Sequence, residues 1–370
     1  MKRLLFALLA CCILALPCRA EAAGPSPGLL VPVIPDARTG HYRITVSDAE
    51  TITAASVTRS VERTGITAKT DVFVEYPLDV EHPQTYYVTV SALPEADRIG
   101  LDAPASKTFP VTTGCCPGVE GAFILGDGSA ADPYQVYTPA QLRHVQQHLD
   151  AQFVQKQDIT LTGTWTPLGT LTGVYDGGGY SILELNTTDG LFSSLNGATV
   201  KSVNLVSPTV QGTNYVGGIA GTSALSNLTN CTVTSGTIYG DARAAGGPVF
   251  AGGIIGYSDS STVINCKATG SVGGIANGAA LYQGGITGHN IQSSYIGCLS
   301  SIIFLGAEGT STHTGGIVGV LGGYISPITL QNCHWTAPAW AVGSGSNTGF
   351  TPNTGDSFGN SQVPSIDGLS

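Results

Sequence analysis

A short segment with a glycine pair at its second and third positions occurs four times in the second half of the chain. The copies span residues 216–221, 251–256, 283–288 and 314–319, and their first glycines lie 35, 32 and 31 residues apart. A cysteine follows the first glycine by 14 residues in three copies and by 18 in the fourth, at Cys231, Cys266, Cys298 and Cys333. Self-similarity at this period predicts stacked supersecondary units.

Polar and apolar residues alternate around each cysteine, as they do in a β-strand. In residues 262–268 we expect Ile264, Cys266 and Ala268 to share the buried face, with Val263 out of phase. A repeat of about 30 residues fits one turn of a three-sided parallel β-solenoid with two or three short strands per turn. Equivalent residues of successive turns, including the four cysteines, should then stack about 4.8 Å apart.

The glycine pairs suit the corners of such a coil, because glycine accepts positive φ and a close backbone approach. We therefore expect Gly253→Val to damage folding more than Ser260→Val, since a corner with positive φ resists a β-branched side chain.

Together these residues resemble the GLUG repeat family, whose signature is Gly-Gly-hydrophobic-x-Gly followed by Asn-Cys. Residues 265–272 are the best local match, and the similarity continues upstream through residues 132–134, 167–169, 176–182 and 190–192. It covers roughly residues 126–350. The resemblance implies a β-solenoid in a bacterial secreted or surface protein. Relatives in that family range from adhesin-like proteins to immunoglobulin-A peptidases.

The first 23 residues have the features of a secretion signal. Lys2 and Arg3 precede an apolar run over residues 4–16, and small residues follow around Ala20 and Ala22. This run is short for a membrane anchor, and Leu9 is bulky for lipidation at Cys11. We expect an exported chain, secreted or held at the cell surface, which passes through the periplasm if the cell is Gram-negative.

Residues 25–113 carry more charge and fewer glycines than the repeats. Alternating strands are predicted at 41–47, 71–76 and 85–90, with weaker candidates at 52–57 and 108–112. This pattern favours a small β-sandwich of immunoglobulin or fibronectin type. Residues 114–125 are the expected linker, within which Cys115 and Cys116 could pair with each other or cap a domain.

A single helix is predicted between the two β regions. Thr138 can cap it, Pro139 suits its first position and Gln141 completes a capping box. Leu142, Val145 and Leu149 then line one face, which we place across the first coil of the solenoid. At the other end Trp335 and Trp340 should cover the last coil, before a flexible tail at residues 351–370.

Composition narrows the possible functions. The chain has 50 glycines and 11% charged residues, and its net charge of -10 argues against nucleic acid and anionic membranes as partners. The repeat cysteines have the spacing of a buried file, in which cysteine is a small apolar filler and not a metal ligand. Disulfides between adjacent rungs are the alternative, if their geometry allows it.

Catalytic chemistry is not evident. Glycosidic cleavage needs two carboxylates at a set separation, but Asp241, Asp259 and Glu308 occupy different phases of the repeat. Asp176 has a turn-stabilising setting. The histidines His289, His313 and His334 also occupy non-equivalent positions, so stacking should not bring them together. We predict no catalytic, cofactor-binding or metal-binding residues.

The expected function is an adhesin-like binding or structural module that is not an enzyme. Its repeated polar faces and corner loops at residues 239–248 and 273–282 would meet a host glycan or a surface protein. We expect a monomer or a component of a surface assembly, without a membrane-spanning segment in the mature chain. The alternatives are a polysaccharide-degrading β-helix enzyme and a passive spacer.

Overall fold

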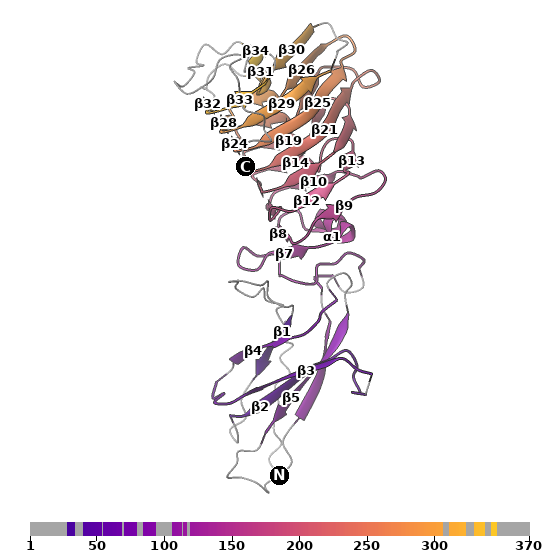
Figure 1. Cartoon of the computed structure of the whole chain (residues 1–370), viewed down its shortest axis with the longest axis vertical. Helices are drawn as coiled ribbons and strands as arrows, with labels where there is room; N and C mark the ends of the chain where they lie inside the picture. Colours follow the sequence, from indigo (N-terminus) through magenta and orange to yellow (C-terminus); the bar gives the residue numbers. More distant parts are fainter. Residues whose placement is uncertain are drawn as a thin grey trace. The chain divides into compact units, whose positions relative to one another are not determined.

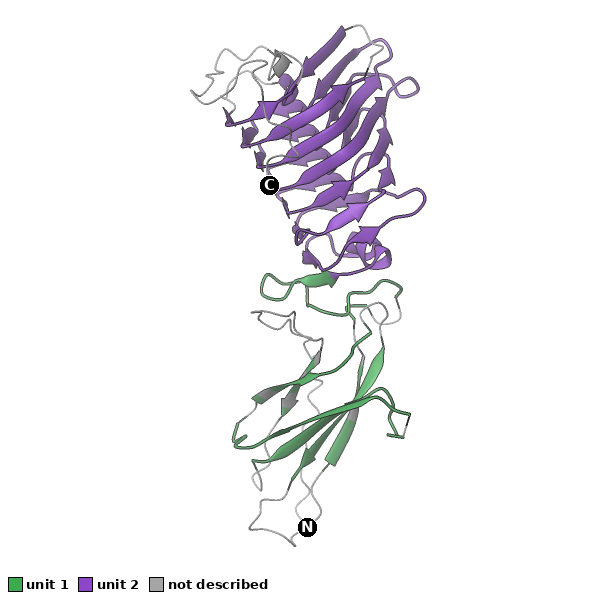
Figure 2. Cartoon of the chain, in the orientation of Figure 1, with its two compact units in different colours: residues 1–135 green, residues 136–370 purple. Residues whose placement is uncertain are grey.

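A computed structural model describes residues 28–33, 40–53, 55–68, 70–79, 84–93, 106–112, 114–116, 119–305, 311–322, 329–336 and 342–345. The expected signal at residues 1–23 and tail at 351–370 lie outside these residues. The chain forms two compact units, residues 1–135 and 136–370 (Figure 2). Among the described residues, no helix has the length and apolar character needed to cross a membrane.

The first unit contains two antiparallel sheets. One pairs β1 (Gly28–Val33) with β4 (Thr70–Glu75). The other has the order β3-β2-β5-β6 and consists of β3 (Thr58–Arg63), β2 (Tyr42–Ser47), β5 (Thr85–Ala92) and β6 (Ser106–Thr112). Alternate residues of β2, such as Ile44 and Val46, are fully buried. The predicted β-sandwich is therefore confirmed in its two-sheet, antiparallel arrangement.

One strand prediction for this unit was wrong, and one strand was not predicted. Residues 52–57 form no strand, and the chain pairs instead through the polar strand β3 that follows. Ile52 and Val57 are 53% and 40% exposed, so their apolar character does not reflect burial. The strand β1 went unpredicted because its run of apolar residues contains Pro32, which is tolerated at a sheet edge.

The predicted helix is present but short. Helix α1 (Pro139–His144) starts at Thr138, whose hydroxyl accepts a hydrogen bond from Gln141 N at 3.2 Å. A 3₁₀ turn, η1 (Val145–Gln147), follows directly. Leu142 and Val145 are completely buried. Gln146 Oε1 accepts from Gly169 N at 2.6 Å at the start of the first coil, which confirms the capping position.

The second unit is a parallel β-solenoid, in which each strand pairs with its equivalent in the next coil (Figure 1). The first sheet consists of β10 (Leu168–Leu171), β14 (Phe192–Asn196), β19 (Ala220–Ala224), β23 (Ile255–Asp259), β27 (Thr287–Ile291), β31 (Val318–Gly322) and β34 (Val342–Gly345). The second sheet runs through β8 (Gln152–Gln155), β11 (Val174–Asp176), β15 (Thr199–Lys201), β20 (Asn227–Thr229), β24 (Thr262–Ile264), β28 (Ser294–Ile296) and β32 (Leu330–Gln331). Strand β7 (Tyr134–Val136) spans the boundary between the units.

Two more sheets complete the coils. The third sheet contains β9 (Ile159–Thr160), β12 (Ser181–Leu183), β13 (Asn186–Thr187), β16 (Asn204–Val206), β17 (Thr209–Gly212), β21 (Thr232–Asp241), β25 (Lys267–Ile275), β29 (Leu299–Phe304) and β33 (His334–Trp335). The fourth contains β18 (Tyr215–Gly217), β22 (Val249–Gly252), β26 (Ala280–Gly284) and β30 (Ser311–Gly315). The glycine-pair repeats thus have four sides, and the prediction of a three-sided coil was wrong for them.

Inward residues form columns along the coil axis. In the second sheet the in-register residues are all buried: Val200, Leu228, Val263, Tyr295 and Leu330. Val263 therefore faces the core and Ile264 does not, contrary to the predicted phase. The alternation breaks because Asn265, between the second and third sheets, has a φ of 52° and turns the chain.

The cysteines form the expected file. Cys231, Cys266, Cys298 and Cys333 are at most 1% exposed. The residues that follow them pair one rung apart, as Thr232 with Lys267 and Lys267 with Leu299. The predicted single-coil register is confirmed, and no disulfide joins the cysteines that the structure describes.

The recurring Asn-Cys and Gly-Cys pairs mark one corner of each coil. The residue before each cysteine has positive φ, between 52° and 64°, at Asn230, Asn265, Gly297 and Asn332. Asparagine and glycine are the residues that adopt this left-handed conformation most readily. Their recurrence therefore follows from the corner geometry.

A second corner carries a buried polar column. Ser226 Oγ accepts a hydrogen bond from Ala198 N at 3.0 Å, and Ser261 Oγ accepts one from Ser226 N at 3.2 Å. In the next coil, Ser293 Oγ accepts a hydrogen bond from Ser261 N at 3.0 Å. These hydroxyls satisfy backbone donors that turn away from the strand ladder, so each corner can be buried without an orphaned amide.

The glycine pairs lie at the corner between the fourth and first sheets, but the predicted reason for glycine there was wrong. Gly253 does not have positive φ, whereas Ser260 does, at 49°. A Cβ on Gly253 would instead collide with the carbonyl oxygen of Gly285 and lie 2.6 Å from Ala268 Cβ. Close approach of consecutive coils is what excludes a side chain.

We predict that Gly253→Ala lowers the free energy of unfolding by about 3 kcal/mol, because the added methyl group forces two coils apart. Ser260→Gly is the comparison, and it should change stability by less than about 1 kcal/mol because glycine accepts the left-handed corner. Chemical denaturation of both variants measures the difference. Equal losses would show that the coils do not pack as closely as described.

Candidate functional site

Four rings stack along the outer side of the fourth sheet. Tyr215, Phe250, Tyr282 and His313 come from successive strands of this sheet, and we call them the aromatic ladder. Neighbouring ring centroids lie 5.5, 5.1 and 5.0 Å apart, with interplanar angles of 11°, 8° and 14°. The stack therefore repeats at the spacing of the coils.

Two further rings lie against the ladder from the first sheet. Tyr257 and His289 stack on each other with centroids 4.8 Å apart and an angle of 7°. The edge of His289 meets Phe250 at 4.8 Å and 80°, while Tyr257 meets Tyr215 at 5.6 Å and 84°. The six residues together form what we call the ring cluster.

Strand periodicity places these side chains outside the core. In β22, Val249 and Ala251 are completely buried, so Phe250 between them points to the opposite face. Phe250 is nevertheless only 8% exposed, because the surrounding rings cover it. Aromatic contacts of this kind contribute about 0.5–1.5 kcal/mol per pair beyond area burial, so they stabilise this arrangement of the rings.

The accessible parts of the cluster differ along the ladder. The inner rings use their faces to stack on one another, which leaves their edges outward. Tyr215 is 42% exposed and begins the ladder, because β18 is the terminal strand of the fourth sheet. Among the described residues, only Phe250 stacks on it face to face. Tyr215 can therefore offer its second face to a ligand.

Burial sets the electrostatics of the flanking pair. It lowers the pKa of His289, with a smaller opposing effect from Asp259, and it raises the pKa of Tyr257. The Nδ1 atom of His289 is buried and has no hydrogen-bond partner in the described part of the chain. The flanking pair is therefore uncharged at neutral pH, and it suits a ligand recognised by stacking and hydrogen bonding.

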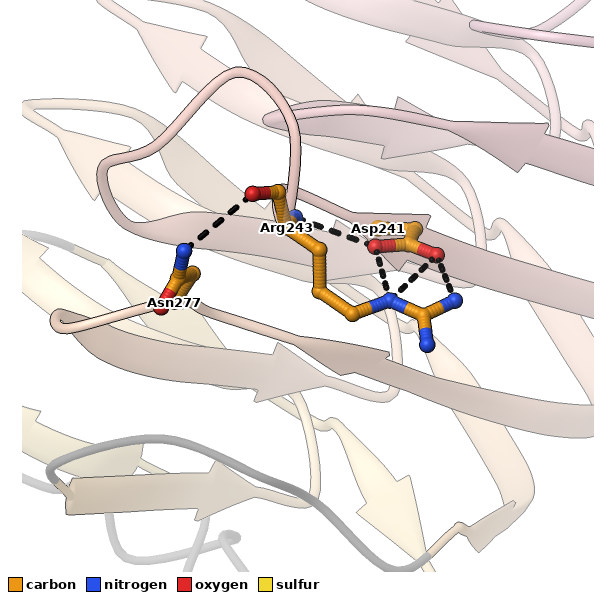
Figure 3. A network of polar contacts seen from close by, with 3 residues as sticks. All are labelled: Asp241, Arg243 and Asn277. Atoms are coloured by element: carbon orange, nitrogen blue, oxygen red, sulfur yellow. Dashed lines mark hydrogen bonds and ion pairs between the residues drawn. The ribbon is translucent and has the colours of Figure 1, made fainter.

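The corner loop predicted at residues 239–248 is tied down by its own polar groups (Figure 3). The Arg243 guanidinium donates from Nε to Asp241 Oδ1 at 3.0 Å, and Asn277 Nδ2 donates to the Arg243 carbonyl at 3.1 Å. Asn214 Nδ2 also donates to the carbonyls of Gly246 and Pro248, at 3.0 and 2.8 Å. The two charged side chains of the loop, Asp241 and Arg243, form an ion pair with each other.

Stacking does not assemble a carboxylate pair from the predicted acidic residues. Asp241 ends a strand of the third sheet and pairs in register with Ile275, while Asp259 ends a strand of the first sheet between Ala224 and Ile291. Glu308 lies outside the described residues. Retaining and inverting glycosidases need two facing carboxyl groups, and these two described positions lie on different sides of the coil.

Asp176 has the turn-stabilising contact that its sequence setting suggests. Its Oδ1 accepts a hydrogen bond from Gly178 N at 2.9 Å, and its Oδ2 lies 3.0 Å from Lys201 Nζ. Both oxygens of this carboxylate thus have a structural partner.

One carboxyl group in the first unit is perturbed by its surroundings. Asp132 is 4% exposed, and neither of its carboxylate oxygens has a hydrogen-bond partner among the described residues. Burial, with a contribution from Asp127, raises its pKa to about 6. Its main-chain oxygen holds a tight turn by accepting from Asp127 N and Gly128 N. We assign Asp132 to that turn.

The prediction that stacking would not bring the histidines together describes only part of their arrangement. His289 and His313 belong to strands β27 and β30 and do not stack on each other, yet both join the ring cluster. His334 lies on β33 in the third sheet. Stacking brings the first two histidines together with tyrosines and phenylalanine that occupy the same phases of other repeats.

The sequence contains a signal for the ring cluster. Each ladder residue precedes the first glycine of its repeat by two positions, and Tyr257 and His289 follow theirs by five. One aromatic or imidazole residue per repeat at a constant phase predicts a column. The column is hard to recognise in the sequence because its positions carry phenylalanine or histidine in some repeats and tyrosine in others.

Comparison with known proteins gives no relative: no protein-family model, no curated protein and no solved structure matches this chain.

We predict that His289 makes stability depend on pH. Its pKa is lowered by folding, so the unfolded chain binds the proton more readily. Stability is therefore full above the unfolded pKa of about 6.5 and falls as the pH drops below it. Melting temperatures from pH 8 to pH 5 should decline less steeply in His289→Gln than in the unchanged protein. Identical slopes would contradict this prediction.

Proposed function

We propose that this chain is an exported, adhesin-like module that binds an extracellular glycan through the ring cluster and performs no catalysis itself. The observation that carries the proposal is the outward-facing aromatic ladder on the solenoid, with Tyr215 exposed at its start. The six side chains come from strands held in register by main-chain hydrogen bonds, so the surface needs little ordering when a ligand arrives.

The chemistry of the cluster matches a neutral sugar. A pyranose ring has a face of C–H groups that packs on an aromatic ring, and Tyr215, at the start of the ladder, is 42% exposed. The hydroxyls of sugars need donors and acceptors, which Tyr257, Tyr282 and His313 carry at partly exposed positions. The coil-to-coil repeat of the rings further suits a ligand that itself repeats.

Low charge supports the same reading. Only six charged residues occur between positions 201 and 350, and the described pair Asp241 and Arg243 neutralise each other. A charged polymer would find little complementary field on this solenoid. The resemblance to GLUG repeats, which occur in adhesin-like surface proteins, is consistent with the proposal.

Export is part of the proposed function. The basic, apolar and small-residue segments of residues 1–23 have the order of a secretion signal. We predict that mature protein, isolated from the cells that produce it, begins between Glu21 and Gly24 when its N-terminus is measured by mass spectrometry. Mature material that retains Met1, or that carries lipid on Cys11, would contradict this prediction.

Binding is tested on a glycan array with the purified chain and two variants. Tyr215→Ala should weaken binding by about 2 kcal/mol, or roughly thirtyfold, since it removes the exposed stacking face. Tyr180→Ala is the matched control, because Tyr180 is 40% exposed elsewhere in the solenoid. It should bind like the unchanged protein.

The array, together with a cell-binding assay, separates the alternatives. A spacer would bind neither the glycans nor the cells. A chain whose ligand is a surface protein would bind no glycan on the array but would still bind cells. An enzyme would shorten the bound polysaccharide over time, which chromatography of the array ligand in solution would reveal. Equal loss of binding in Tyr215→Ala and Tyr180→Ala would argue against the ring cluster as the binding surface.

A further inference from the structure

Two histidines lie close together where the capping helix ends. His144 is the last residue of α1, and His148 follows the 3₁₀ turn η1. The spacing of four residues puts both side chains on one side of the helical segment. Their ring centroids are 5.2 Å apart, with an interplanar angle of 55°. His144 is buried and His148 is partly exposed.

The backbone that holds this pair is well anchored. Leu142 and Val145 are completely buried on the same helical segment. On the C-terminal side, the carbonyl of Leu149 accepts hydrogen bonds from Thr172 N at 2.9 Å and Gly173 N at 3.0 Å. The pair is thus fixed against the first coil from both directions, as a metal site requires of its ligands.

The separation of the rings agrees with shared coordination of one ion. A zinc–nitrogen bond of about 2.1 Å, extended by roughly 1.1 Å to the ring centre and opened to the tetrahedral angle, separates two imidazole centroids by about 5.2 Å. The tilt between the rings also distinguishes this pair from the packed pair Tyr257 and His289, which is parallel to within 7°. The two imidazoles are tilted against each other and do not stack.

We propose that His144 and His148 bind a divalent transition-metal ion, with zinc as the preferred ion, at the N-terminal end of the solenoid. Imidazole nitrogen suits zinc, copper and nickel better than calcium or magnesium. The pair supplies two of four tetrahedral positions, and solvent or further donor atoms fill the others. Because the ion would bind only the folded segment, it would stabilise the cap of the solenoid. This proposal is independent of glycan binding.

The test uses the full chain without a histidine tag, stripped of metal by dialysis against a chelator. Zinc titration followed by calorimetry should give one ion per chain, and the melting temperature should rise with zinc concentration. His148→Gln and His144→Gln should each weaken zinc binding by at least about tenfold. His334→Gln is the matched control, since it removes an imidazole from the third sheet and should bind zinc like the unchanged protein.

Cobalt(II) supplies a readout that a merely structural role of the histidines would not change. The unchanged protein should develop the visible absorption bands of tetrahedral cobalt, and His148→Gln should lose them. Far-ultraviolet circular dichroism verifies that His148→Gln, the variant at the partly exposed position, remains folded. Absence of zinc binding in the unchanged protein would overturn the proposal. So would undiminished binding in a variant that carries both His144→Gln and His148→Gln.

Discussion

The main-chain hydrogen bonds between successive coils are the constraint on which the solenoid depends. Each strand pairs in parallel with the strand one repeat later, so every residue of a rung lies directly against its equivalent. This spacing leaves no room for a side chain where two backbones meet at a corner. Gly253 faces the carbonyl of Gly285 there, and the glycine pairs recur because the contact recurs.

Because of this register, residues at one position of the repeat form a column along the solenoid. A cysteine at one phase becomes a buried file, and a serine at another phase becomes a ladder of corner hydroxyls that accept backbone amides. An aromatic residue two positions before the glycines becomes a stack of rings on the outer side. Because each column adds equivalent contacts coil after coil, a weak preference at one position becomes a continuous surface or core.

Each end of the solenoid has a neighbouring coil on one side only, unlike the coils of its middle. At the N-terminal end, α1 and η1 cover the first coil with apolar side chains and with the Gln146 amide. At the other end, Trp335 is buried on β33, the terminal strand of the third sheet, as its position in the last repeat predicted. The predicted partner Trp340 lies outside the described residues. The histidine pair at the first end and the ring cluster on the outer side are therefore separate functional candidates within one unit.

Periodicity in the sequence was sufficient to predict the β-solenoid, its one-coil register, the buried cysteines and the capped start of the helix at Thr138. These features depend on local chemistry repeated at a constant interval, which a single sequence displays. The periodicity could not reveal that Gly253 is required for the close approach of two coils while Ser260 adopts positive φ. The backbone angle φ at these positions is set by how the coils meet. The fourth sheet, the inward position of Val263 and the meeting of His289 with Phe250 also required the tertiary structure. In each case a corner changes the direction of the chain, so residues distant in sequence come into contact and strand alternation no longer predicts which side chains face one another.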